Sequence, residues 1–235
     1  MPASIPWTAA EAPCTVVTHG MFIETAAERI RRITARDGGD TATQTLRTGE
    51  REASERIEQL AHFDSLTGLL SYSTFQRVLD SELDKTDKND TALTTMVLDI
   101  NNIQEINADR GHSAGDDAIC HLASTVRRLI RGIDTVARYG GDEVVVILPE
   151  TGRDAARVIA ERFMGRFRES LPAHLQDLSI SLGHATYPDD THVRENLLKV
   201  TEQALHLAKF KGSKTGESAC IACHEIDELN DKTVI

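Results

Sequence analysis

The sequence predicts an α+β fold, an α/β sandwich built on a ferredoxin-like antiparallel sheet with helices on one face and an N-terminal helical segment before it. Short apolar segments alternate with amphipathic stretches of helical length from residue 64 onward. Their order is β-α-β-β-α-β with extra elements, which is typical of that sheet. Gly140 and Gly141 separate two apolar segments. Such a pair indicates a hairpin, because type I′ and II′ turns need positive φ angles.

The first 60 residues differ from the rest. Residues 26–33 and 45–62 show helical periodicity, and the second stretch places Leu46, Ala53 and Leu60 seven residues apart. This spacing indicates a weak coiled-coil stripe, and an amphipathic helix lying on its own domain fits the pattern equally well. We assign residues 1–60 to a helical signalling or dimerisation segment with a coiled-coil linker, 61–225 to a globular domain and 226–235 to a C-terminal tail.

Within the globular domain the expected elements follow from periodicity and from turn residues. They are a helix over 73–83, a polar loop over 84–91, a strand over 93–98, a short helix, a helix over 114–131, hairpin strands over 135–139 and 144–148, a helix over 154–168, a strand over 178–183, a helix over 193–210 and a last strand over 218–223. In a ferredoxin-like sheet the first and third strands are neighbours, so Asp99, Asp142 and Glu143 are expected at one edge. Three carboxylates there favour a divalent cation such as magnesium, although an ordinary solvated turn also accounts for the hairpin pair alone.

Composition narrows the function. The chain has 235 residues and a formal net charge of −11, which argues against binding to nucleic acid or to an anionic membrane. No apolar run approaches the roughly 18 residues of a membrane span, and the N-terminus lacks the basic start of a signal peptide. We therefore expect a cytoplasmic protein. Four cysteines are too few and too scattered for a disulfide scaffold.

Five motifs stand in a fixed order along residues 61–223. They are DSLTGL at 64–69, LDINNI at 98–103, GHSAGD at 111–116, GGDEV at 140–144 and ALHLAKFKG at 204–212. In this order and spacing the chain resembles the GGDEF family, the diguanylate cyclases. The fifth residue of the signature is Val144 where the family has Phe. This apolar exchange is expected to alter packing more than chemistry.

The resemblance implies a definite reaction. Two GTP-loaded domains of a homodimer face each other, each 3′-hydroxyl attacks the other nucleotide's α-phosphate, and cyclic di-GMP and pyrophosphate result. The implied catalytic residues are Asp99, Asp142 and Glu143. Two magnesium ions, with manganese as an alternative, would be bound by Asp99, the Ile100 carbonyl, Asp142 and Glu143.

The resemblance also implies how GTP is recognised. Asn107 and Asp116 would read guanine, because a carboxylate can accept from the guanine N–H donors that adenine lacks, while an amide serves N3 or O6. Lys209 would meet the terminal phosphates.

A second nucleotide site is implied by Arg131 and Asp134, which match the family's Arg-x-x-Asp product-inhibition motif, together with Arg162. Guanidinium groups suit bidentate capture of a guanine edge or a phosphate of cyclic di-GMP. The alternative is a surface ion pair at a helix end.

Two positions lack a cation that the family carries near the phosphates. Gln104 stands where many members have Lys, and Ser213 where they have Arg. Losing positive charge at a triphosphate site weakens stabilisation of the developing charge. The alternative function is therefore a catalytically degenerate domain that acts as a receptor for GTP or cyclic di-GMP.

Cys220, Cys223 and His224 form a C-x-x-C-H motif, the attachment signal for c-type haem. Covalent haem attachment takes place outside the cytoplasm, whereas GTP is inside it. The motif also falls on the last expected strand, where cysteine acts as a small buried hydrophobe. We expect structural cysteines and no haem, and a haem or redox sensor remains the second alternative.

Overall fold

A computed structural model describes residues 62–215 and 218–225, without the side chains of residues 213–215. The expectations for the helical segment 1–60, for the tail 226–235 and for the Ser213 side chain therefore lie outside the described residues.

The centre of the domain is a mixed five-stranded sheet in the order β2-β3-β1-β4-β5. The strands are β1 (Leu93–Ile100), β2 (Thr135–Arg138), β3 (Glu143–Pro149), β4 (Ile180–Tyr187) and β5 (Ala219–Ala222). Within β2-β3-β1-β4 each neighbouring pair is antiparallel, and the order of these four strands confirms the ferredoxin-like core. β5 runs parallel to β4, which the expected antiparallel sheet did not include. The reason is the helical crossover between them, which returns the chain in the same direction.

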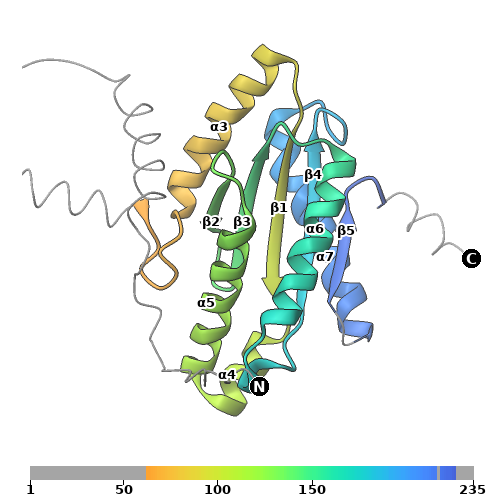
Figure 1. The fold of residues 1–235 in the computed structure, drawn as a ribbon. Helices are drawn as coiled ribbons and strands as arrows, with labels where there is room; N and C mark the ends of the chain where they lie inside the picture. Colours follow the sequence, from red (N-terminus) through yellow and green to blue (C-terminus); the bar gives the residue numbers. More distant parts are fainter. Residues whose placement is uncertain (1–61, 216–217, 226–235) are drawn as a thin grey trace, which may run out of the picture.

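Helices cover both faces of the sheet (Figure 1). They are α3 (Tyr72–Asn89), α4 (Ile103–Arg110), α5 (His112–Leu129), α6 (Arg153–Ser170) and α7 (Leu197–Thr215), with 3-10 turns at Ala173–Leu175 and Arg194–Asn196. The expectation of helices on one face was wrong. α5 and α6 form one core with the sheet, while α3 and α7 form a second core on the opposite face.

Residue alternation along β1 explains the two cores. All eight residues of β1 are buried. Successive side chains of a strand point to opposite faces. Met96 and Leu98 lie in the core beneath α5 and α6, and Val97 lies in the core beneath α3 and α7. A strand buried on both sides needs helices on both sides.

Several element boundaries differ from the expectation. α3 continues to Asn89 through the stretch predicted as a polar loop, because Thr86 extends the buried face of the helix. The helix ends at Asp90, which adopts a left-handed φ of 50° and whose N–H bonds to the Thr86 carbonyl. β4 begins at Ile180 and not at 178, and it continues to Tyr187. The expected helix over 193–210 is a 3-10 turn followed by α7, which reaches Thr215.

α7 lies directly on the sheet. A Cβ built at Gly183 of β4 would stand 2.1 Å from the backbone N of Leu205, so only glycine permits this approach. The hydroxyls of Thr95 on β1 and Thr201 on α7 are 2.6 Å apart and join the two elements inside the core. This close contact fixes the position of the side chains that α7 extends toward the end of β1.

No helix within residues 62–215 or 218–225 combines the length and the apolar character needed to cross a membrane.

Candidate functional site

The expected carboxylates meet where β1 ends and β3 begins. Asp99 is paired with Glu143 in the β1–β3 register and is 3% exposed. Lys209 of α7 reaches both residues, with its Nζ 2.7 Å from Asp99 Oδ2 and 3.6 Å from Glu143 Oε1. Asp142 precedes β3, and its charge acts on Asp99. The sheet order therefore brings together residues that are more than 40 positions apart in the sequence.

The electrostatics of this cluster centre on Asp99. The pKa of Asp99 is raised to about 6, mainly by burial and also by the charges of Asp142 and Glu143, while the hydrogen bond from Lys209 opposes this rise. Burial lowers the pKa of Lys209, but the hydrogen bond to Asp99 and the nearby carboxylates outweigh this, so that its pKa lies above the ordinary value. The lysine is thus a charged ammonium that neutralises a carboxylate cluster.

The donor set suits a hard cation. Two carboxylates around one ammonium mark a position where positive charge is stabilised. The oxygens that could bind magnesium there are those of Asp99, Asp142, Glu143 and the Ile100 carbonyl. Within residues 62–215 and 218–225, no three His, Cys, Asp or Glu side chains are arranged to hold a metal by themselves. This arrangement still fits magnesium, which commonly takes one or two carboxylates and completes its shell with water and substrate phosphate.

A cleft of about 500 Å³ opens beside the carboxylates. It is lined by the end of β1, the loop into α4, one side of α4 and the segment before β4. Asp99, Asp142, Lys209 and Gln104 all line it. Gln104 is uncharged where the family resemblance implies a lysine, and the cations that line the cleft include Arg110 and Lys209.

The expected guanine-reading pair lies at the contact between α4 and α5. Asn107 of α4 faces Gly115 of α5 so closely that a Cβ at Gly115 would stand 2.2 Å from Asn107 Oδ1. That amide oxygen is buried without a hydrogen-bond partner. Buried polar atoms are rarely left unpaired, so this oxygen is an exception among the described side chains. Asp116 follows Gly115 and is exposed, and neither Asn107 nor Asp116 lines the cleft.

The role of Gly115 was missed in the sequence. The signal that could have found it is a residue without a side chain immediately before Asp116 inside a helix.

The hydrogen bonds of the Asn101 side chain were also not predicted from the sequence. Its Nδ2 donates to Ser179 Oγ at 2.9 Å, and its Oδ1 accepts from Ser181 Oγ at 2.7 Å. Two serine hydroxyls from the segment that enters β4 therefore satisfy an amide at the end of β1. Nothing in the local sequence around Asn101 indicates these partners, because they lie about 80 positions away.

The Gly-Gly turn differs from the expected geometry. Gly68 and Gly111 are the glycines with positive φ among the described residues, so neither Gly140 nor Gly141 adopts the angles of a type I′ or II′ turn. Arg138 pairs with Val144, which leaves a wider turn over residues 139–143. A Cβ at Gly140 would approach the Glu143 carboxylate to 3.0 Å, so any larger residue there requires that side chain to shift by a few tenths of an ångström.

Comparison with known proteins decides the family. Residues 61–215 match the family model described as "Diguanylate cyclase, GGDEF domain". The chain belongs to the GGDEF family. The GGDEF fold is also shared with a solved structure of truncated TpbB from Pseudomonas aeruginosa that comprises only the GGDEF domain. The two have a TM-score of 0.60 and 29% identity, over 68% of this chain and 92% of the other.

Two curated relatives that match this chain are named for different activities. The cyclic di-GMP phosphodiesterase NbdA of Pseudomonas aeruginosa is 31% identical over 167 residues, which are 70% of this chain and 21% of NbdA. The diguanylate cyclase DgcM of Escherichia coli strain K12 is 30% identical over 165 residues, which are 70% of this chain and 40% of DgcM. The GGDEF chain thus spans less than half the length of either relative.

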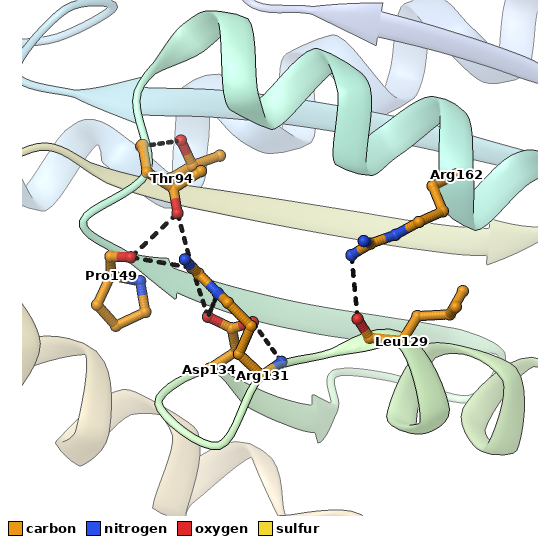
Figure 2. A network of polar contacts seen from close by, with 7 residues as sticks. Thr94, Leu129, Arg131, Asp134, Pro149 and Arg162 are labelled. Atoms are coloured by element: carbon orange, nitrogen blue, oxygen red, sulfur yellow. Dashed lines mark hydrogen bonds and ion pairs between the residues drawn. The ribbon is translucent and has the colours of Figure 1, made fainter.

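Figure 2 shows the three residues of the expected inhibitory site around the end of α5. Asp134 is 5% exposed and accepts hydrogen bonds from the backbone N of Arg131 at 2.7 Å and from its Nη2 at 2.7 Å. Arg131 Nη2 also donates to Thr151 Oγ1 at 2.9 Å. Arg162 extends from α6 and donates to the Leu129 carbonyl at 3.0 Å. Arg131 and Asp134 of the Arg-x-x-Asp motif thus form an internal ion pair.

The C-x-x-C-H motif lies at β5 and just beyond it. Cys220 packs against the core beneath α5 and α6, whereas Cys223 packs against the core on the opposite face. Burial raises the pKa of the Cys220 thiol to about 12. His224 lies 3.7 Å from the Asp190 carboxylate. The two side chains therefore pack on different faces of the sheet.

Proposed function

We propose that this GGDEF chain is a diguanylate cyclase that condenses two GTP molecules into cyclic di-GMP and releases pyrophosphate. The observation that carries the proposal is the meeting of Asp99 and Glu143 on adjacent strands with the Lys209 ammonium between them. A carboxylate cluster that contains the ammonium of Lys209 is suited to a magnesium–nucleotide substrate. The family model and relatives such as DgcM support the enzyme class.

Each group at the site has a role in this reaction. Asp99, the Ile100 carbonyl, Asp142 and Glu143 would hold two magnesium ions, for which manganese could substitute. The ions would neutralise phosphate charge and lower the pKa of the attacking hydroxyl. Lys209 would turn from the carboxylates toward the terminal phosphates. Its charge is secured by the surrounding acids, as its raised pKa indicates.

Base selection is assigned to Asn107 and Asp116. The unpaired Oδ1 of Asn107 supports this assignment, because a buried acceptor without a partner favours a ligand that brings a donor. Asp116 would accept from the guanine N1–H and N2–H₂ groups. Adenine offers neither donor in that arrangement, so we expect GTP to be preferred to ATP.

Regulation and assembly complete the proposal. Two copies of the chain would face each other as a homodimer, since each GTP must be attacked by the other. Arg131, Asp134 and Arg162 would bind the cyclic di-GMP product and inhibit the enzyme. The reaction would take place in the cytoplasm, where GTP is available. Neither nucleic acid nor membrane is a proposed partner.

A receptor without turnover is the second candidate. Gln104 lines the cleft at the position where the family resemblance implies a lysine near the phosphates, and the matched segment of NbdA belongs to a protein named as a phosphodiesterase. A GGDEF domain of this kind would bind GTP or cyclic di-GMP and act through protein contacts. A haem or redox role has no comparable support, since the two cysteines lie on opposite faces of the sheet.

Incubation with GTP and magnesium, with and without added cyclic di-GMP, separates these functions. The cyclase predicts cyclic di-GMP and pyrophosphate from a dimeric preparation, no product from ATP, and a lower rate when product is added. Bound nucleotide without product in the same preparation would favour the receptor.

A further inference from the structure

Tyr139 ties the signature turn to a distant helix. It is the residue before Gly140, and its backbone N donates to the Glu143 carbonyl at 2.8 Å across the turn. Its phenol hydroxyl donates to the carboxylate of Glu202 on α7. The resemblance to the GGDEF family assigned no role to either side chain. The hydrogen bond spans 63 sequence positions, so it links elements that the local sequence does not relate.

Glu202 and Lys209 lie on the same side of α7. They are seven residues apart, which is two helical turns or roughly 10 Å along the axis. Lys209 contacts Glu143, the residue that ends the turn, while Glu202 contacts Tyr139, the residue that begins it. One helix face therefore holds both ends of the turn over residues 139–143. Between these ends lies Asp142.

The phenol ring is itself held in place. The Tyr72 ring of α3 meets the Tyr139 ring edge-on, with centroids 4.9 Å apart, and the Phe75 ring lies 6.3 Å away at a similar angle. Edge-to-face pairs of this kind are favourable beyond the area they bury. Burial, followed by the hydrogen bond and the charge of Glu202, raises the pKa of Tyr139 well above its ordinary value. The phenol therefore keeps its proton and acts as the donor.

Arg138 holds the turn through the carbonyls of Gly140 and Gly141, but the glycines add no side-chain contacts of their own. Around a Cβ position at Gly141 there is no other heavy atom within 4 Å. Glycine also loses more conformational freedom on ordering than other residues. Fixing the two ends of the turn therefore restricts a segment that its own side chains do not restrict.

We propose that Tyr139 and Glu202 are positioning residues of the cyclase. Their hydrogen bond holds the turn over residues 139–143 against α7, so that Glu143 stays within reach of Lys209 and Asp99. This inference rests on the proposed function for its catalytic consequence, but the tether itself is a property of the folded chain. Neither side chain is assigned a contact with GTP.

Amide hydrogen exchange tests the tether without nucleotide or metal. Tyr139→Phe removes only the hydroxyl and keeps the ring against Tyr72. We expect exchange at residues 140–143 to become about five- to tenfold faster, since the bond joins a carboxylate and a neutral donor. Glu202→Ala should give the same change, and Glu202→Gln, which keeps an acceptor oxygen, should restore most of the protection.

Tyr187→Phe is the matched control, because the Tyr187 hydroxyl donates to Asp87 Oδ1 at 2.8 Å at the far end of β4. It should leave exchange at residues 140–143 unchanged. Wild-type exchange in both Tyr139→Phe and Glu202→Ala would overturn the tether. The tether would also be overturned if Tyr187→Phe accelerated exchange at residues 140–143 as much as Tyr139→Phe does, because the effect would then be general.

Turnover separates this inference from the proposed function. Tyr139→Phe should lower kcat about fivefold or more and leave the KM for GTP within about twofold, because a misplaced Glu143 affects chemistry more than base recognition. A rise of about fivefold or more in the KM for GTP with unchanged kcat would contradict a positioning role. If the wild-type protein forms no product, the proposed function fails, and hydrogen exchange still decides whether the tether exists.

Discussion

Arg138, the last residue of β2, donates from Nη1 to both carboxylate oxygens of Asp64, at distances of 3.1 and 2.9 Å. The same guanidinium donates from Nε to the carbonyls of Gly140 and Gly141 at 3.1 and 3.2 Å. The first sequence motif of the domain therefore supports the backbone of the turn that leads to Glu143.

Arg138→Ala should destabilise the domain. Both partners are mostly buried, with about one fifth of each side chain exposed. Removing the guanidinium leaves the Asp64 carboxylate with fewer donors, so we expect a loss of about 1–3 kcal/mol in the free energy of unfolding, measured by urea denaturation. Arg166→Ala is the control, because its ion pair with Glu169 is exposed and should change stability by less than about 0.5 kcal/mol. Equal effects of the two substitutions would contradict a supporting role for Arg138.

Gly115→Ala should weaken GTP binding. The new methyl group would meet the Asn107 amide, which has to shift because the contact would be 2.2 Å. We expect the KM for GTP to rise about tenfold or more, since displacing a recognition group costs about 1.4 kcal/mol or more. Gly165→Ala, on α6 with open space around its Cβ position, serves as the control and should leave KM unchanged. An unchanged KM in Gly115→Ala would remove Asn107 from base recognition.

Substitutions at the Arg-x-x-Asp site should separate regulation from stability. Arg162 donates one hydrogen bond at the surface, so Arg162→Ala is expected to raise the concentration of cyclic di-GMP needed for inhibition about tenfold and to leave the melting temperature nearly unchanged. Asp134→Ala removes the acceptor for the Arg131 backbone N and should cost about 1–3 kcal/mol of unfolding free energy. Full inhibition of Arg162→Ala by cyclic di-GMP would contradict the inhibitory site and leave the Arg131–Asp134 pair as a structural contact.

His184 should make stability depend on pH. Burial, together with the positive charge of His224, lowers the pKa of His184 to about 4 although the Asp190 carboxylate opposes this. Between pH 6.5 and 4 the unfolded state binds the proton more strongly, so stability falls as the pH drops, by about 3 kcal/mol at pH 4. We expect His184→Gln to lose this part of the pH dependence when unfolding is followed from pH 7 to 4.5. Parallel stability curves for the two proteins would show that His184 is not the titrating group.

The sequence predicted the parts of this fold that follow from pattern and topology. Apolar strands and their order fixed the neighbouring positions of β1 and β3, and with them the meeting of Asp99 and Glu143. Helix lengths were less predictable, because the continuation of α3 depends on the burial of Thr86 by tertiary packing. The second helical layer escaped prediction for a similar reason. Local periodicity identifies the apolar face of a helix but does not say which face of the sheet that helix covers.

The site was predictable in its residue types and not in its contacts. The resemblance to the GGDEF family assigned Lys209 to phosphate, whereas in the structure its Nζ lies 2.7 Å from Asp99 Oδ2. The local sequence of α7 gives no sign of this partner, which lies 110 positions away. Hydrogen bonds between distant residues, such as those of Asn101 with Ser181 and of Tyr139 with Glu202, leave no local signal. The prediction of positive φ angles at Gly140 and Gly141 was wrong, because the turn is wider than a two-residue hairpin.

The most direct test of the cyclase is the rate of cyclic di-GMP formation from GTP and magnesium by the wild-type protein and by Glu143→Gln. The substitution keeps the size of the side chain and removes its charge. We expect product from the wild type and a loss of at least about a hundredfold in Glu143→Gln, with unfolding unchanged, because removing one group that helps stabilise developing charge typically costs that much. No product from the wild type, or substantial product from a folded Glu143→Gln protein, would contradict it.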